Sequence, residues 1–261
     1  MVAEFFQVRR PFVVSVLIFF DFAIFRRCLN LLTVLRREEK YPLTMQETIN
    51  FANRFSILMM TDKYSRHGSY LVRSLYFDTI DDKDFFDKLN EQNLRRKVRL
   101  RIYDPSDQTA KLELKQKENI YQKKRSLSIS RADAQALIDG NFSVLLNYPD
   151  DFAAEMFAIM TQEGYRPKSI VSYQRKAFKA KENNIRITFD SNIQATESCF
   201  DLFSPNLPQY SILSPEKTIL EVKYDRFMLS YISEIISQID RRSISSSKYC
   251  LSRQLGYPLR Y

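Results

Sequence analysis

The sequence predicts a single α+β domain built around an antiparallel β-sheet. Its 261 residues are enough to bury a substantial core. From Arg36 onward, short segments that alternate polar and apolar residues, as strands do, are interrupted by a few helical patterns. No internal repeat or low-complexity tract divides the sequence. We therefore expect residues 33–261 to form the domain and residues 1–32 to lie outside it.

The expected elements alternate between strands and single helices. Strands are expected at residues 36–43, 70–78, 97–103, 110–117, 123–129, 169–180, 184–190 and 216–224. Helices are expected at residues 44–60, 81–89, 131–139, 151–163, 227–239 and 246–255. Two helices have explicit N-terminal signals. Thr44 and Glu47 form a T-x-x-E capping box, and Ser130 precedes the helix that Gly140 ends.

An excess of positive charge limits the classes of partner. Lys and Arg number 40 against 31 acidic residues, so the formal net charge is +9. The partner is therefore expected to be negatively charged: nucleic acid, anionic lipid or a phosphate polymer. Three widely spaced cysteines fit neither a disulfide framework nor a close-spaced zinc site, and favour a reducing, cytoplasmic location. The single histidine, His67, is expected on an ordinary surface.

Residues 11–25 form an apolar stretch between two arginine pairs. They number 15 and include Asp21, whereas a membrane-spanning helix needs about 20 apolar residues. No small-residue cleavage pattern follows them, which argues against a signal peptide. A membrane-associating anchor, a helix packed on the domain and a non-native extension all remain open, and so does membrane association through residues 11–25.

Charged side chains recur on one face of the expected strands. Residues two positions apart in a strand point to the same side of the sheet. The groups that share a face in this way are Arg36, Glu38 and Lys40; Lys97, Arg99, Arg101 and Tyr103; Lys111, Glu113, Lys115 and Lys117; Arg186, Thr188 and Asp190; and Glu221 and Lys223. The solvated side of an antiparallel sheet explains this pattern. A closed barrel that turns these faces inward also explains it, as a tunnel that binds a polyanion and a metal.

Eight short motifs follow one another along the chain. They are R-x-E-x-K-Y from Arg36, RSLYFDT from Arg73, K-x-R-x-R-x-Y from Lys97, ELK from Glu113, SYQRKAF from Ser172, IRITFD with Arg186, LEVKY from Leu220 and SSKY from Ser246. In order and spacing they resemble the VTC (vacuolar transporter chaperone) domain, the polyphosphate polymerase branch of the triphosphate tunnel metalloenzymes, over residues 36–257. The resemblance implies an antiparallel β-barrel, the triphosphate tunnel, with helices packed outside it.

The same resemblance implies the residues of the site. Carried over by motif position, the basic lining would be Lys40, Lys88, Arg99, Arg101, Lys115, Lys124, Arg175, Arg186, Lys223 and Lys248, with Ser247 as a hydroxyl contact. Glu221 would bind Mn²⁺ or Mg²⁺. Lys88 stands where the resemblance favours an arginine, and Lys124 could exchange its role with Lys123 or Arg125.

The implied activity is transfer of the terminal phosphoryl group of ATP to a growing polyphosphate chain. Phosphoryl transfer depends mainly on positioning and charge neutralisation, so the chemistry needs no catalytic histidine. One alternative is a triphosphatase or adenylate-cyclase-like tunnel protein, whose first strand typically reads E-x-E-x-K, whereas Arg36 occupies the first of these positions here. Another alternative is a polyphosphate-binding module without turnover. Nucleic acid is not expected as a partner because no binding motif accompanies the charge, and the sequence does not predict an oligomeric state.

Overall fold

The computed structural model describes residues 36–254, except residues 66–67, 120 and 246. Residues 11–25, Cys28 and His67 lie outside the described residues, so the expectations for them stay open. Among the helices that are described, none is long and apolar enough to cross a membrane.

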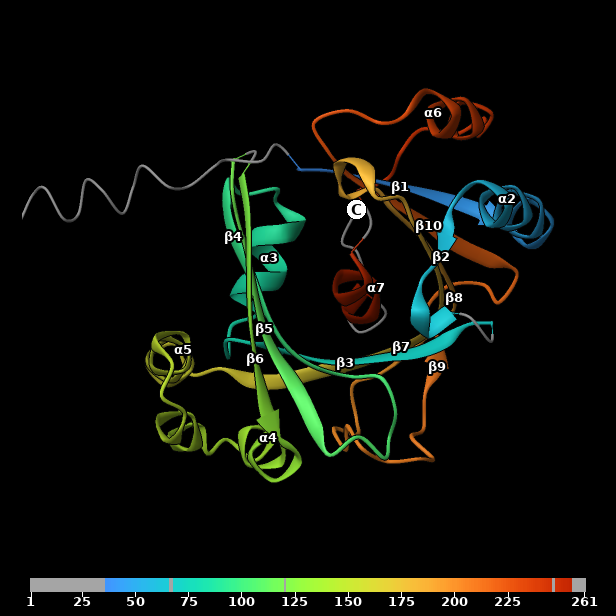
Figure 1. Ribbon diagram of the computed structural model, residues 1–261. Coiled ribbons are helices and arrows are strands. Elements are labelled where there is room, and N and C mark those ends of the chain that lie inside the picture. Colours follow the sequence, from blue (N-terminus) through green and yellow to red (C-terminus); the bar gives the residue numbers. More distant parts are fainter. Residues whose placement is uncertain (1–35, 66–67, 120, 246, 255–261) are drawn as a thin grey trace, which may run out of the picture. The chain divides into compact units, whose positions relative to one another are not determined.

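An antiparallel sheet of ten strands forms the centre of the domain (Figure 1). Its eight long strands are β1 (Arg36–Thr44), β3 (Tyr70–Asp78), β4 (Leu94–Ile102), β5 (Thr109–Glu118), β6 (Tyr121–Ser130), β7 (Arg166–Lys179), β8 (Arg186–Thr196) and β10 (Lys217–Asp225). They are ordered β1-β10-β8-β7-β3-β4-β5-β6. Two short strands extend the sheet, β2 (Met60–Thr61) beside β7 and β9 (Tyr210–Ser211) beside β8. The expected α+β class with an antiparallel sheet is therefore confirmed.

The sheet curves strongly, so that its two edge strands, β1 and β6, approach each other (Figure 1). Within the described part of the chain, no ladder of backbone hydrogen bonds joins β1 to β6. A side-chain contact spans the opening instead, because Lys115 Nζ on β5 lies 3.0 Å from Glu38 Oε2 on β1. The two ends of the sheet are thus held together through side chains.

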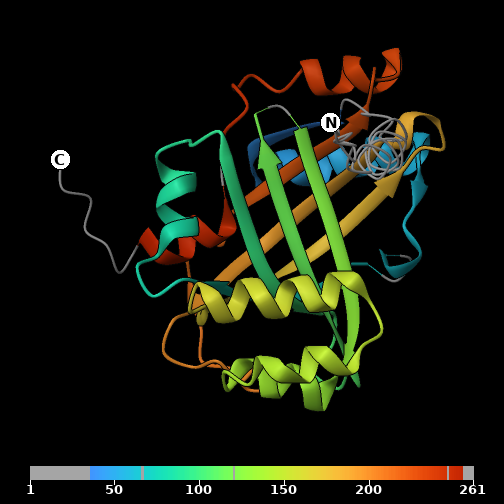
Figure 2. The same ribbon diagram turned by 90° about the vertical axis from the view of Figure 1, so that its left-hand side faces the viewer.

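Helices cover the convex side of the sheet in two groups. The first comprises α4 (Arg131–Ile138) and α5 (Asp151–Gln162), which lie across the green strands in Figure 2. They pack on buried residues such as Leu100 and Leu112. The second comprises α2 (Met45–Leu58) and α6 (Ser230–Ser237), which pack on Phe178 and Leu220. Side chains alternate along each strand, and these apolar residues therefore leave the charged positions to the concave side.

Two short helices lie on the concave side, and for them the expectation of helices packed only outside the sheet is wrong. They are α3 (Lys83–Leu89) and α7 (Lys248–Gln254), and Figure 1 shows α7 within the curve of the sheet. Phe85 of α3 and Tyr249 of α7 pack against Tyr76 and Tyr173 of the concave face. The reason is that this part of the concave face is aromatic rather than charged, so it buries the apolar sides of both helices.

The N-terminus of α2 is fixed by the capping box that the sequence predicts. The Thr44 side chain accepts a hydrogen bond from the Glu47 amide, and Glu47 Oε2 accepts one from the Thr44 amide at 2.7 Å. We expect Thr44→Ala to lower the free energy of unfolding by about 1 kcal/mol in urea titrations, because the mutation leaves helix amides without a partner. Thr48→Ala is the matched control. Thr48 only donates back to the Thr44 carbonyl, so an equal loss in both variants would contradict the capping role.

Candidate functional site

The concave face of the sheet encloses an inner cavity of about 110 Å³. Six strands contribute to its lining, and so do Ser247 and Lys248 at the start of α7. The cationic residues of the lining are Lys40, Lys97, Arg99, Arg101, Lys115, Arg175, Lys223 and Lys248. The carboxylates are Glu38 and Glu221, and Tyr76, Tyr173 and Ser247 complete the lining. Eight cationic side chains against two carboxylates make this cavity a strong attractor for a polyanion.

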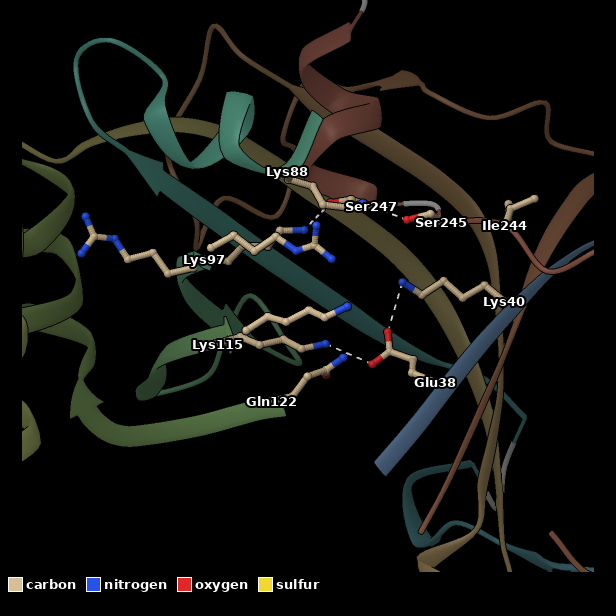
Figure 3. A pocket seen from close by; sticks show the side chains of 12 residues that line it. Glu38, Lys40, Lys88, Lys97, Lys115, Gln122, Ile244, Ser245 and Ser247 are labelled. Atoms are coloured by element: carbon tan, nitrogen blue, oxygen red, sulfur yellow. Dashed lines mark hydrogen bonds and ion pairs between the residues drawn. The ribbon is translucent and has the colours of Figure 1, made fainter. Parts of the chain in front are cut away.

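An outer cavity of about 170 Å³, whose lining is drawn in Figure 3, adjoins the inner one through shared residues. Both are lined by Glu38, Lys40, Lys97, Lys115 and Ser247. The outer cavity adds further cations, Lys88 of α3 and Arg95, Arg96 and Lys117 of β4 and β5. Lys88 Nζ donates to Ser245 Oγ at 2.8 Å, which holds this lysine at the wall of the outer cavity. Positive charge therefore continues from the deep part of the site to its outer end.

Arg175 is held in the inner cavity by a buried carboxylate. Its Nε and Nη2 donate to the two oxygens of Asp190 at 2.6 and 2.7 Å, and Lys248 Nζ donates to Asp190 Oδ2 at 2.6 Å. Burial alone would raise the pKa of Asp190, but Arg175 and Lys248 lower it below its usual value. Asp190 thus stays ionised and fixes both cations in position.

Glu221 is surrounded by cations. Its carboxylate lies 2.9 Å from Lys223 Nζ, 3.5 Å from Arg175 Nη2 and 3.9 Å from Lys40 Nζ. Despite burial, Lys223 and Lys40 lower the pKa of Glu221 well below its usual value. Glu38 is a close neighbour and lies 3.1 Å from Lys40 Nζ. The site therefore contains two adjacent ionised carboxylates among lysines.

Arg99 and Arg101 are oriented by Glu113 on the adjacent strand β5. Arg99 Nε donates to Glu113 Oε2 at 2.7 Å, and Arg101 Nη1 lies 3.7 Å from the same oxygen. Burial would raise the pKa of Glu113, but Arg99 and Arg101 lower it to about 2. Arg101 also donates from Nε to Ser74 Oγ at 3.1 Å. These contacts fix the guanidinium planes and leave other N–H groups directed toward the cavity.

Most of the residues that the sequence assigns to the site come together. Nine of them line the inner cavity: Lys40, Arg99, Arg101, Lys115, Arg175, Lys223, Lys248, Ser247 and Glu221. Lys88 lines the outer cavity. The expected lining role is not seen for Lys124 and Arg186, which line neither cavity. Lys124 pairs with Glu113, which also pairs with Arg99 and Arg101, and Arg186 Nη2 donates to Asp62 Oδ2 at 3.2 Å. Each side chain is thus held by a carboxylate that itself lines neither cavity.

Lys97 is a site residue that the motif assignment missed. The strand alternation places it on the same face as Arg99 and Arg101, but the residues carried over by motif position did not include it. Its Nζ donates to Ser247 Oγ at 2.5 Å. Burial is the main cause that lowers the pKa of Lys97 to about 7, and neighbouring Lys40, Lys115 and Lys88 contribute to this lowering while Cys250 opposes it. Tyr76 and Tyr173 were also missed. Neither is charged, so the alternation of charged side chains did not mark them as site residues.

The donor set of the site fits a hard divalent cation that is shared with phosphate. In the described residues, no group of three or more His, Cys, Asp or Glu side chains could hold a metal by itself. Glu221 and Glu38 together offer two carboxylates on adjacent strands β10 and β1. Mg²⁺ is commonly bound by one or two carboxylates together with substrate phosphates. Glu221 and Glu38 can therefore hold Mg²⁺ or Mn²⁺ once a phosphate ligand supplies the remaining oxygens.

Comparisons with known proteins place the chain in a family. A solved structure of a "putative adenylate cyclase" from Bacillus halodurans is 11% identical, covers 82% of this chain and 93% of its own, and has a TM-score of 0.48. A conserved hypothetical protein from Pyrococcus furiosus is 8% identical, with 81% and 96% covered and a TM-score of 0.43. No curated protein matches. The VTC domain family matches residues 35–257, which is most of the chain, and the protein therefore belongs to the VTC domain family.

Proposed function

We propose that the protein is a metal-dependent polyphosphate polymerase of the triphosphate tunnel superfamily, which transfers the terminal phosphoryl group of ATP to a growing polyphosphate chain. The composition of the inner cavity carries this proposal. Among the described residues that line it, eight cationic side chains lie close together with two carboxylates, and Glu113 and Asp190 pair with four of these cations from outside the lining. Cations that line one small, partly desolvated cavity repel one another strongly. A bound polyphosphate would relieve that repulsion along the whole cavity.

The curved sheet would serve as the wall of the tunnel. The ladder is open between β1 and β6, but Lys115 and Glu38 bridge the opening at 3.0 Å. The inner and outer cavities adjoin through shared residues, so a linear anion can contact cations from Arg175 to Lys88. This length of positive charge suits a chain of phosphates better than a single phosphate group.

The residues of the cavity would have different roles in phosphoryl transfer. Arg99, Arg101 and Arg175 would each bind phosphate oxygens with paired N–H donors, while the lysines act as point charges. An oxygen of the terminal phosphate of the chain would attack the γ-phosphorus of ATP. The bond from this phosphorus to the oxygen that bridges it to the β-phosphate would break, and ADP would leave. The attacking oxygen is already anionic at neutral pH, so this transfer needs no general base.

A divalent cation would be held by Glu221, with Glu38 beside it. When bound, it would neutralise charge on the β- and γ-phosphates during transfer. Lys223, at 2.9 Å from Glu221, would keep this carboxylate ionised and oriented toward the phosphates.

The test is to incubate the purified protein with ATP and Mn²⁺ or Mg²⁺, and to follow ADP together with polyphosphate on a gel. Polymer that grows as ADP forms is the expected result. Free phosphate without polymer would indicate a triphosphatase instead, and tight polyphosphate binding without turnover would indicate a binding module. A single-stranded oligonucleotide is included as a competitor, and strong competition by it would favour a nucleic-acid site.

The lowered pKa of Lys97 predicts a pH-dependent contribution to polyanion binding. Below a pH of about 7, Lys97 is charged and helps to bind tripolyphosphate, whereas above it the amine is neutral. We expect the wild type to bind metal-free tripolyphosphate roughly tenfold more tightly than Lys97→Met at low pH. This ratio should fall toward one as the pH rises, because the wild-type charge is lost.

Isothermal titration calorimetry at several pH values measures this ratio. The charge of the ligand also changes with pH, but it does not alter this ratio because both proteins bind the same ligand. Lys223, whose pKa burial lowers to about 8, is present in both proteins and cancels likewise. Lys123→Met, at an exposed lysine of β6, is the matched control and should bind like the wild type throughout. A Lys97→Met ratio that stays constant with pH would contradict the role of Lys97.

A further inference from the structure

Three tyrosines from separate parts of the chain form a cluster, which we call the tyrosine patch. Tyr64 lies in the short 3₁₀ helix Lys63–Ser65, Tyr70 begins β3, and Tyr103 follows β4. The rings of Tyr64 and Tyr103 are parallel within 2°, with centroids 6.1 Å apart. Tyr70 lies 5.8 Å from Tyr64 and 6.1 Å from Tyr103 between ring centroids. The patch is therefore one aromatic surface.

The tyrosine patch is open to solvent. Tyr64 is 60% exposed and Tyr103 is 37% exposed. Lysines accompany both rings, because Lys63 Nζ lies 4.7 Å from the Tyr64 centroid and Lys111 Nζ lies 6.0 Å from the Tyr103 centroid. Rings whose role is to stabilise the core are normally buried, whereas exposed aromatic rings interleaved with cations are typical of surfaces that bind nucleotides.

The segment that presents Tyr64 is anchored to the sheet. The Asp62 amide donates to the Ala177 carbonyl at 2.9 Å, and the Ala177 amide donates to Ser65 Oγ at 3.0 Å. Lys179 Nζ lies 2.9 Å from Asp62 Oδ2 and adds an ion pair to this attachment. The backbone on either side of Tyr64 is thus attached to the sheet before any ligand binds, which reduces the entropy lost on binding.

The tyrosine patch borders the cationic site. Tyr70 is paired with Arg175 in the β3–β7 ladder, and Arg175 lines the inner cavity. The Tyr70 hydroxyl also accepts a hydrogen bond from Arg186 Nη2 at 3.2 Å. Arg186 is in turn paired with Lys223, another cavity residue, in the β8–β10 ladder. Arg186 therefore lies between the aromatic rings and the cavity.

Arg186 has a donor that the described part of the chain does not use. Its Nε atom is buried and has no hydrogen-bond partner there. A buried N–H without a partner is unfavourable, so a ligand oxygen at this point would be bound favourably. A phosphate that leaves the inner cavity toward the tyrosine patch would supply such an oxygen.

We propose that Tyr64 and Tyr103 form the stacking surface for the base of a nucleoside triphosphate, whose phosphates extend past Arg186 into the inner cavity. The proposal rests on the proposed function, because it assumes that a nucleotide supplies the phosphoryl group. Stacking does not distinguish bases by their hydrogen-bonding edges, so ATP and GTP should bind alike. Tripolyphosphate has no base and should not depend on the tyrosine patch.

A fluorescence experiment tests this directly, because the chain contains no tryptophan. Tyr64→Trp introduces a single indole at the centre of the tyrosine patch. We expect saturating ATP or GTP to quench its fluorescence, since the base stacks on the indole, and tripolyphosphate to leave it nearly unchanged. Equal quenching by tripolyphosphate and ATP, or no quenching by ATP that is bound, would overturn the proposal.

A second set of variants measures the contribution to affinity. In Tyr64→Ala, the ratio of ATP affinity to tripolyphosphate affinity should fall about tenfold, and Tyr64→Phe should keep the wild-type ratio. Tyr231→Ala, at a 39% exposed tyrosine of α6, is the matched control. Partial unfolding would weaken both ligands equally and leave the ratio unchanged.

The outcomes separate this inference from the proposed function. If wild-type protein binds both ligands and Tyr64→Ala binds each of them as tightly as the wild type does, the stacking surface is overturned and the polymerase proposal stands. If the wild type binds neither ATP nor tripolyphosphate, the polymerase proposal fails and the stacking surface fails with it.

Discussion

Glu221→Gln is expected to lower metal-dependent phosphoryl transfer by at least about a hundredfold while tightening the metal-free binding of tripolyphosphate. The substitution keeps the shape of the side chain but removes the charge that would hold the divalent cation. It also removes one of the two carboxylates beside Lys223 and Lys40, which lie 2.9 and 3.9 Å from Glu221, and leaves Glu38 as the other, so metal-free binding of tripolyphosphate should become tighter. Opposite effects on turnover and on binding would distinguish metal loss from general damage to the site.

The measurement combines ADP release at saturating ATP and Mn²⁺ with calorimetry of tripolyphosphate binding in the absence of metal. Glu155→Gln is the matched control, since Glu155 pairs with Arg125 through an Nη2–Oε1 contact of 2.5 Å and lines neither cavity. It should behave like the wild type in both assays. Glu221→Gln with normal metal-dependent turnover would refute the assignment of Glu221 as the metal ligand.

Asp190→Asn is expected to lower the free energy of unfolding by about 3–5 kcal/mol. Asp190 is completely buried and accepts hydrogen bonds from Arg175 and Lys248. A neutral amide cannot balance these two cations, which remain in a partly desolvated site. Arg175 and Lys248 hold the pKa of Asp190 below its usual value, so its contribution is present above the unfolded-state pKa of about 4. The difference between wild type and variant should shrink as the pH falls below that value.

Urea unfolding at neutral pH, with and without tripolyphosphate, measures this effect. A bound polyanion can replace the missing charge of Asp190, so it should stabilise Asp190→Asn more than it stabilises the wild type. Glu155→Gln serves again as the control, because a partly exposed ion pair contributes only about 0–1 kcal/mol. If ligand stabilised both proteins equally, Arg175 and Lys248 would not be contacts of the polyanion.

The long strands were predictable because their side-chain alternation is strong. The expected strand at residues 70–78 coincides with β3, and the helix that Thr44 caps begins as expected. Strands β2 and β9 were not predictable, since two residues do not define a period. The concave position of α7 was not predictable either. A helical pattern shows which side of a helix is apolar, but not which face of a curved sheet will bury that side.

The site was predictable where neighbours on the same strand share a role, as Arg99 and Arg101 do. It was not predictable where a distant carboxylate determines the direction of a long side chain. Arg186 follows the alternation of its strand, yet Asp62, from a different part of the chain, turns it toward Tyr70. Lys124 is held in a similar way by Glu113 on the neighbouring strand. Contacts of this kind depend on tertiary structure, which a local pattern does not contain.

The opening between β1 and β6 has a consequence for how a long product could leave. Separating the two edges would break the contact of Lys115 with Glu38, and Lys115 is itself 36% exposed. Ion pairs with such exposure contribute only about 0–1 kcal/mol, and salt weakens them further. A ladder of backbone hydrogen bonds would resist separation far more. A polymer bound along the cavity could therefore leave sideways through the separated edges of β1 and β6. It would not have to slide along the whole cavity to leave by one end.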